Sequence, residues 1–154
     1  MGTNARDPHS EGGTAIIEFT IALPVLLLML VATAEIGRML SQYNTLNKAV
    51  RDGARYLAAN ALAGTTGVVS ITPAVQTATV NLVVNGNTAG TGAALLPNLA
   101  AGNVTVAGLA NGYVSVSAAY TYVPMMGANL PTFGVTAPIN TSVTLNASVV
   151  MRPL

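Results

Sequence analysis

The feature that most constrains this chain is an apolar stretch near its N-terminus, residues 12–34 (GGTAIIEFTIALPVLLLMLVATA). Sixteen residues separate Glu18 from Glu35, and none of them is charged. A helix needs about 20 apolar residues to cross a bilayer core of about 30 Å. Extending the run back to Ala15 therefore predicts one membrane-spanning helix over residues 14–34, with Glu18 as the one charge inside it.

A carboxylate in such a helix is unfavourable, by about 2.5–3.5 kcal/mol at the bilayer centre and by less near the ends. Two interpretations of Glu18 follow. In the first, it lies at headgroup level, solvated and favoured by the partial positive charge of the helix N-terminus. In the second, it pairs with a cationic group of another chain. The charge alone does not separate the two, but the neighbouring residues favour the second.

The residues around Glu18 resemble the processing motif of type IV prepilins. Gly13 is followed by four residues, then by Glu18 and the aromatic Phe19. In that family a membrane peptidase cleaves after the glycine, so the resemblance implies a leader over residues 1–13 and a mature chain that starts at Thr14. It also implies subunit pairing at Glu18 and Phe19, in which the Glu18 carboxylate meets the new N-terminal amine of a neighbouring subunit.

Charge is concentrated at the N-terminal end of the chain. Ten of the eleven charged residues lie in the first 55 positions, and the segment from Tyr56 to Met151 contains no Asp, Glu, Lys, Arg or His. General acid–base catalysis, a hard-metal or zinc site and a basic nucleic-acid surface therefore lack their usual residues there. The chain also has no cysteine. We expect no enzyme activity, no cofactor, no metal site and no nucleic-acid partner.

The helix is predicted to extend past the span, over residues 35–63. Apolar or small residues recur there at alternating intervals of three and four, which is typical of a helix with one packing stripe. The predicted stripe consists of Ile36, Met39, Tyr43, Leu46, Val50, Gly53 and Leu57. Gly53 is disfavoured in a helix by about 1 kcal/mol relative to alanine, which indicates close packing at that point.

A second resemblance covers residues 12 to about 56, which are similar to the TadE-like family, pilin-related proteins of bacterial tight-adherence secretion systems. The resemblance rests on Glu18-Phe19, Pro24, Glu35-x-Gly37-Arg38, Asn44, Ala49 and the block Arg51-Asp52-Gly53-Ala54-Arg55. Five charged residues of this stretch are interpreted as a helix interface with other subunits, with a simple solvated face as the alternative. They are Glu35, Arg38, Arg51, Asp52 and Arg55.

The resemblance implies a minor pilin or pseudopilin of a tight-adherence type IV pilus, processed after Gly13 and acting in pilus assembly or priming. The implied partners are a prepilin peptidase, other pilin or pseudopilin subunits, the inner-membrane assembly platform and the lipid bilayer. The alternative is a single-pass accessory protein of the same secretion apparatus that never enters the fibre.

The resemblance further implies a single-pass protein of the bacterial inner membrane, with its C-terminal domain outside the cytoplasm or in a surface pilus. The charge pattern leaves the orientation open, because Arg6 is the one cation before the span and four cations follow it before residue 56. We adopt the orientation that the resemblance implies.

Residues 68–154 are predicted to form a small antiparallel β domain packed on the C-terminal half of the helix, after a hinge at residues 64–67. The predicted strands lie at 68–72, 77–84, 103–109, 113–123 and 142–151. Asn111-Gly112 predicts a two-residue hairpin, Asn85-Gly86 a second turn, and residues 124–138 a long loop. The predicted fold class is α+β.

Four aromatic residues of this domain, Tyr113, Tyr120, Tyr122 and Phe133, are interpreted as core packing. A surface binding patch is the alternative.

Overall fold

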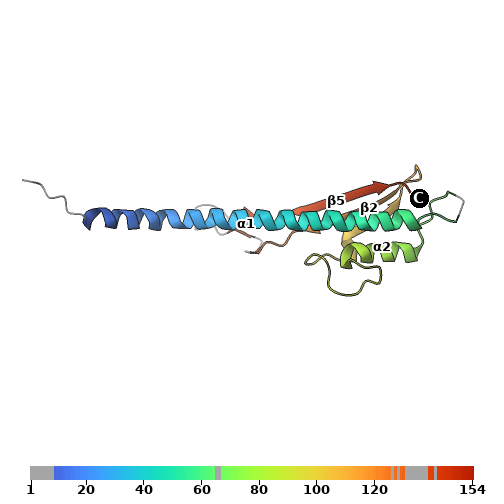
Figure 1. Ribbon diagram of the computed structural model, residues 1–154, viewed down its shortest axis with the longest axis horizontal. Helices are drawn as coiled ribbons and strands as arrows, with labels where there is room; N and C mark the ends of the chain where they lie inside the picture. Colours follow the sequence, from blue (N-terminus) through green and yellow to red (C-terminus); the bar gives the residue numbers. More distant parts are fainter. Residues whose placement is uncertain (1–8, 65–66, 126, 128, 131–138, 141) are drawn as a thin grey trace, which may run out of the picture. The chain divides into compact units, whose positions relative to one another are not determined.

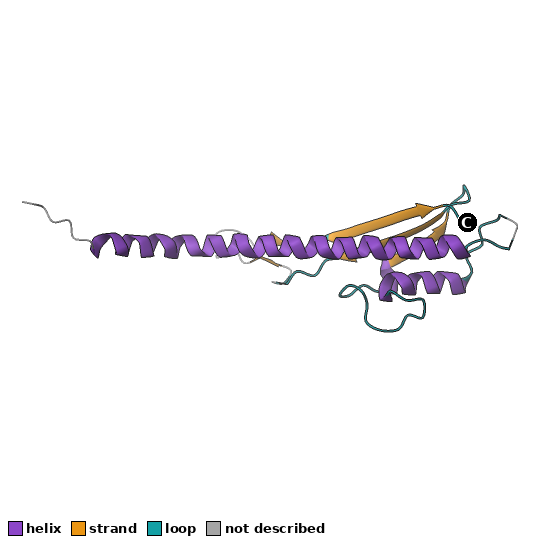
Figure 2. Ribbon diagram, in the orientation of Figure 1, coloured by secondary structure: helices purple, strands orange, loops and turns teal. Residues whose placement is uncertain are grey.

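The computed structural model describes residues 9–64, 67–125, 127, 129–130, 139–140 and 142–154 (Figure 1). The chain divides into two compact units, Met1–Arg38 and Met39–Leu154. Helix α1 (His9–Asn60) contributes to both units. The second unit adds a short helix and a small antiparallel sheet (Figure 2), so the predicted α+β class is confirmed.

The sheet has three strands, β1 (Val104–Gly108), β2 (Val114–Thr121) and β5 (Thr144–Met151), in the order β1-β2-β5. Both pairings are antiparallel, and the three predictions for these segments are confirmed. Along β2, alternate residues from Val114 to Tyr120 are buried. This two-residue period is expected when one face of a sheet packs on a core.

The turn between β1 and β2 is longer than predicted. The Leu109 backbone N–H donates to the Tyr113 carbonyl over 2.7 Å, which leaves a three-residue loop instead of a two-residue hairpin. Gly112 adopts φ 75° in this loop. Three-residue hairpins place a residue with positive φ at this point, and glycine takes that conformation without steric cost.

A second, two-stranded pairing joins β3 (Asn129–Leu130) to β4 (Ile139–Asn140). Both strands fall within or beside the predicted loop at 124–138, of which residues 126, 128 and 131–138 lie outside the described residues. Residues 65 and 66 of the predicted hinge also lie outside them.

The predicted strand at 77–84 is wrong, because this segment belongs to helix α2 (Pro73–Asn85). The Thr72 side chain accepts a hydrogen bond from the Val75 backbone N–H, and Pro73 stands in the first turn. Gly86 ends the helix in the left-handed conformation, so Asn85-Gly86 is a helix C-cap and not a hairpin turn. These are standard helix-boundary signals, and they outweigh the strand propensity of the valines between them.

The predicted strand at 68–72 is also wrong, because this segment forms no strand and Val69 makes only an isolated bridge with Leu62. Past α2, the chain runs through an irregular segment and a short 3₁₀ helix, η1 (Ala101–Asn103), before it enters β1.

The core of the second unit lies between α1, α2 and the sheet, and Figure 1 shows β2 and β5 alongside the C-terminal part of α1. The α1 side chains in this core are Leu46, Ala49, Val50, Ala54, Leu57, Ala58 and Ala61. The predicted stripe is confirmed at Leu46, Val50, Gly53 and Leu57.

The predicted stripe is wrong at Tyr43 and Ile36, whereas Met39 is half-buried and packs against the core. Tyr43 is 39% exposed, and Ile36, in the first unit, is 55% exposed. The buried position next to Tyr43 is taken by Gln42, a polar residue that the pattern of apolar residues could not identify. The Tyr120 hydroxyl donates to the Gln42 side-chain oxygen over 2.9 Å, which satisfies both groups inside the core.

The aromatic residues interpreted as core packing differ in their exposure. Tyr120 and Tyr122 are buried, as the core-packing interpretation requires, whereas Tyr113 is 42% exposed at the β1–β2 turn. Phe133 lies outside the described residues.

Replacing Tyr120 with phenylalanine is expected to lower the free energy of unfolding of the second unit by about 1–3 kcal/mol, because it leaves the buried Gln42 oxygen without its donor. The matched control is Tyr113→Phe, which removes an exposed hydroxyl and is expected to change stability by less than about 0.5 kcal/mol. Denaturant unfolding of the full chain in detergent, followed by near-ultraviolet circular dichroism, measures both. Equal stabilities for the two variants would contradict the assigned role of this hydrogen bond.

Candidate subunit interface on the N-terminal helix

The N-terminal part of α1, within the first unit, exposes nearly all of its apolar side chains. Nine large ones are each more than half exposed: Ile16, Ile17, Phe19, Ile21, Val25, Leu26, Leu27, Met29 and Leu30. In the described part of the chain, one helix is long and apolar enough to cross a membrane, and it is this one. An uncovered apolar surface of this extent is unfavourable in water and suits lipid or neighbouring helices.

Two polar side chains in this segment are satisfied by the helix itself. The Thr20 hydroxyl donates to the Ile16 carbonyl, and the Thr33 hydroxyl donates to the Met29 carbonyl, both over 2.8 Å. Such bonds to the carbonyl four residues earlier let a hydroxyl lie in an apolar environment without an unpaired donor.

Among the described residues, Glu18 has no hydrogen bond of this kind. Its side chain is exposed beside Ile21, Ala22 and Val25, and no hydrogen bond or ion pair links it to another residue in the described part of the chain. A carboxylate on an apolar helix surface remains unfavourable in a membrane until a cation reaches it. The geometry therefore leaves the carboxylate available to a group from outside this chain.

Gly13 and Thr14 both lie inside α1 and are exposed. The predicted cleavage point is thus within helical backbone. Gly12 and Gly13 each disfavour the helix by about 1 kcal/mol relative to alanine, so this turn is an easy place for the backbone to open.

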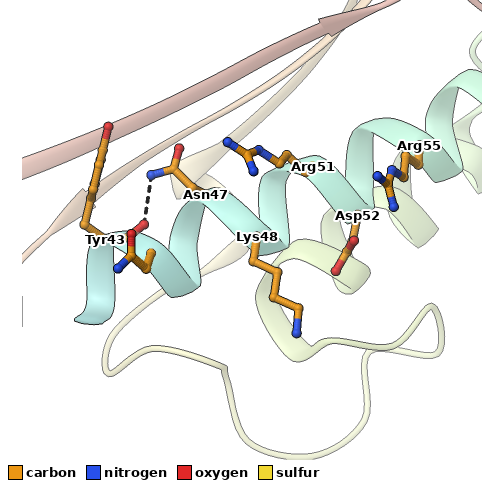
Figure 3. Close-up of a pocket in the computed structure, with 7 residues that line it drawn as sticks. Tyr43, Asn47, Lys48, Arg51, Asp52 and Arg55 are labelled. Carbon is orange, nitrogen blue, oxygen red and sulfur yellow. Dashed lines mark hydrogen bonds between the residues drawn. The ribbon is translucent and has the colours of Figure 1, made fainter. Parts of the chain in front are cut away.

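In the second unit, polar and charged side chains gather on one face of α1 (Figure 3). We call this surface the cationic face, and it consists of Tyr43, Asn44, Asn47, Lys48, Arg51, Asp52 and Arg55. All seven residues come from one helix, so the surface is open and not an enclosed pocket. Lys48, Arg51 and Arg55 are exposed, whereas Asp52 is half-buried.

The block at residues 51–55 is split between two surfaces. Arg51, Asp52 and Arg55 lie on the cationic face, whereas Gly53 and Ala54 are buried against the rest of the second unit. A Cβ atom at Gly53 would lie 2.5 Å from Cγ2 of Val83 in α2. The close packing that Gly53 indicated in the sequence is therefore between α1 and α2 of the same chain.

Two of the predicted interface residues, Glu35 and Arg38, belong to the first unit, where both are half-buried. The prediction omitted four members of the cationic face, Tyr43, Asn44, Asn47 and Lys48. The signal was present in the sequence, because Asn44, Lys48 and Asp52 stand four residues apart, as do Asn47, Arg51 and Arg55.

Comparison with known proteins identifies the helix that carries both surfaces. Residues 13–55 match the family model described as TadE-like protein. This segment is TadE-like. No curated protein and no solved structure matches the chain.

The TadE-like segment begins at Gly13 and ends at Arg55, so it contains Glu18 and the whole cationic face. The sheet and α2 lie outside it. Within the described residues, no cluster of three or more His, Cys, Asp or Glu side chains is placed to hold a metal ion.

Proposed function

We propose that this protein is a minor pilin or pseudopilin of a tight-adherence type IV pilus, which is processed after Gly13 and acts in pilus assembly or priming. The observation that carries the proposal is the unpartnered Glu18 carboxylate on an exposed apolar helix, in a TadE-like segment that begins at Gly13. Cleavage after Gly13 would create a cation, the Thr14 amine, four residues before this carboxylate.

In the proposed mechanism the apolar part of α1 first holds the protein in the inner membrane as a single span. A prepilin peptidase removes residues 1–13, and the assembly platform brings the subunit to its neighbours. The Glu18 carboxylate then pairs with the Thr14 amine of a neighbouring pilin or pseudopilin. The pair neutralises both charges in a low-dielectric environment, which favours a specific register between adjacent helices. The second unit lies outside the cytoplasm.

The first test is the mass and N-terminal sequence of the protein isolated from its native membrane. We expect a chain that begins at Thr14, and we expect Gly13→Glu to block processing while the neighbouring Gly12→Ala leaves it unchanged. A chain that retains residues 1–13 in the presence of the peptidase would reject the proposal. It would instead indicate a single-pass accessory protein of the secretion apparatus that does not enter the fibre.

A further inference from the structure

We propose that the cationic face binds an acidic helix of a different subunit, and not a second copy of this chain. The inference rests on the proposed function in one respect, that the partner is a neighbouring subunit in the same assembly.

The charges of the cationic face are not balanced within the face. Three cations, Lys48, Arg51 and Arg55, accompany one carboxylate, Asp52. In the described part of the chain, none of these four side chains forms an ion pair or hydrogen bond, and Figure 3 shows them extending from the helix separately. The surface therefore carries an excess of two positive charges.

No later segment of the second unit can supply the missing negative charge. The sequence from Tyr56 to Met151 contains no Asp or Glu at any position, whether the structure describes that position or not. The sheet, α2 and the loops between them are therefore neutral. Apart from Asp52, a side-chain carboxylate that forms an ion pair with the cationic face must come from outside the second unit.

A second copy of the chain is a poor source of these groups. After Gly13 the sequence contains three acids, Glu18, Glu35 and Asp52. Glu18 and Glu35 belong to the first unit, and Asp52 is part of the cationic face itself, so two copies meeting through this face would oppose three cations to three cations. Like charges placed together across an interface are repulsive and oppose that pairing.

The arrangement of the face favours a helical protein partner over an anionic lipid surface. The three cations stand at intervals of three and four residues, and the face extends over about 18 Å of helix from Tyr43 to Arg55. A partner helix with Asp or Glu at the same intervals would match them. An anionic lipid surface would repel the Asp52 carboxylate. A protein partner can instead place a hydrogen-bond donor opposite that carboxylate.

The test uses the full chain in its native membrane, with a photoreactive amino acid in place of the exposed Asn44 on the cationic face. The test variant carries Arg51→Glu and Arg55→Glu. The matched control is Arg152→Glu, the same charge change at an exposed arginine outside the face. Near-ultraviolet circular dichroism verifies that each variant is folded, and Arg51→Gln with Arg55→Gln replaces the reversal if it is not.

We expect a crosslink to a different protein that carries acidic residues three or four apart on a helix. The double reversal should lower the yield by at least about tenfold, as expected for loss of close charge pairs, and the control should change it by less than about twofold. Replacing those acidic residues of the partner with lysine should restore the crosslink to the double-reversal variant.

Three outcomes would overturn the inference: a crosslink between two differently tagged copies of this chain, a crosslink to lipid alone, or a yield that is insensitive to the charge reversal. Failure of the proposed function has a separate readout, the N-terminus of the mature chain. An unprocessed chain with a charge-dependent crosslink would reject processing and retain the inference. A processed chain without such a crosslink would support processing and reject the inference.

Discussion

Replacing Glu18 with alanine is expected to leave the protein in the membrane and cleaved after Gly13, while removing it from assembled fibres. The substitution takes away the one carboxylate that faces outward from the apolar segment and has no partner in the described chain. Breaking a buried ion pair by removing one member costs about 3–5 kcal/mol, because the other charge is left uncompensated. We therefore expect incorporation to fall by about two to four orders of magnitude.

The measurement is quantitative immunoblotting of sheared fibres and of membranes from the same cells. Thr33→Ala is the matched control, because the Thr33 hydroxyl is already bonded within its own helix and the change should not affect incorporation. Glu18→Gln separates charge from size and is expected to fail like the alanine variant. Normal incorporation of Glu18→Ala would refute the pairing mechanism.

Replacing Gly53 with leucine is expected to prevent α1 and α2 from packing and to unfold the second unit. Even the Cβ atom alone would lie 2.5 Å from Val83 Cγ2, and Val83 is fully buried. Valine is stiff about χ1 in a helix, so it cannot turn its methyl group aside easily. Overpacking by one methyl group costs about 1–3 kcal/mol, and leucine adds four heavy atoms at this point.

Gly37→Ala provides the control, since nothing lies within 4 Å of a Cβ atom built at that position of the same helix. This change should be neutral or stabilising by up to about 1 kcal/mol, because alanine favours a helix over glycine. Gly53→Ala should be rescued in part by Val83→Ala, which removes the clashing methyl group. Near-ultraviolet circular dichroism of the full chain in detergent compares these variants. A native spectrum for Gly53→Leu would show that the α1–α2 contact is not close-packed.

The sequence was sufficient for the elements whose signals are local and periodic. The long apolar run predicts the exposed helix of the first unit. The spacing of Leu46, Val50, Gly53 and Leu57 predicts the buried stripe of α1 in the second unit. The alternation of apolar and polar residues in β2 and β5 predicts two of the three strands of the sheet. In each case, one face of one element meets one environment, so the pattern can be read without knowledge of its neighbours.

The prediction from sequence failed where strand propensity and helix-capping residues favour different structures. The segment TATVNLVV favours a strand by composition, but Thr72-Pro73 begins α2 and Gly86 ends it. The buried residues Thr79 and Val83 stand four residues apart, one turn of a helix, and both lie next to Gly53 of α1. The sequence therefore contains both a strand propensity and helix-capping signals, and the packing of α2 against Gly53 stabilises the helix.

The order of residues along the chain therefore accounts for the long helix, for Glu18 as the one charge in its apolar segment, and for the lack of Asp, Glu, Lys, Arg and His between Tyr56 and Met151. Packing between distant segments accounts for the rest. The Tyr120–Gln42 hydrogen bond joins residues 78 positions apart, and α2 covers Gly53 while the cationic face stays open. The position of α2 and the sheet determines which side of α1 is buried in the second unit. Residues on that side stabilise the fold, and residues on the other side, including the cationic face, remain accessible to a partner.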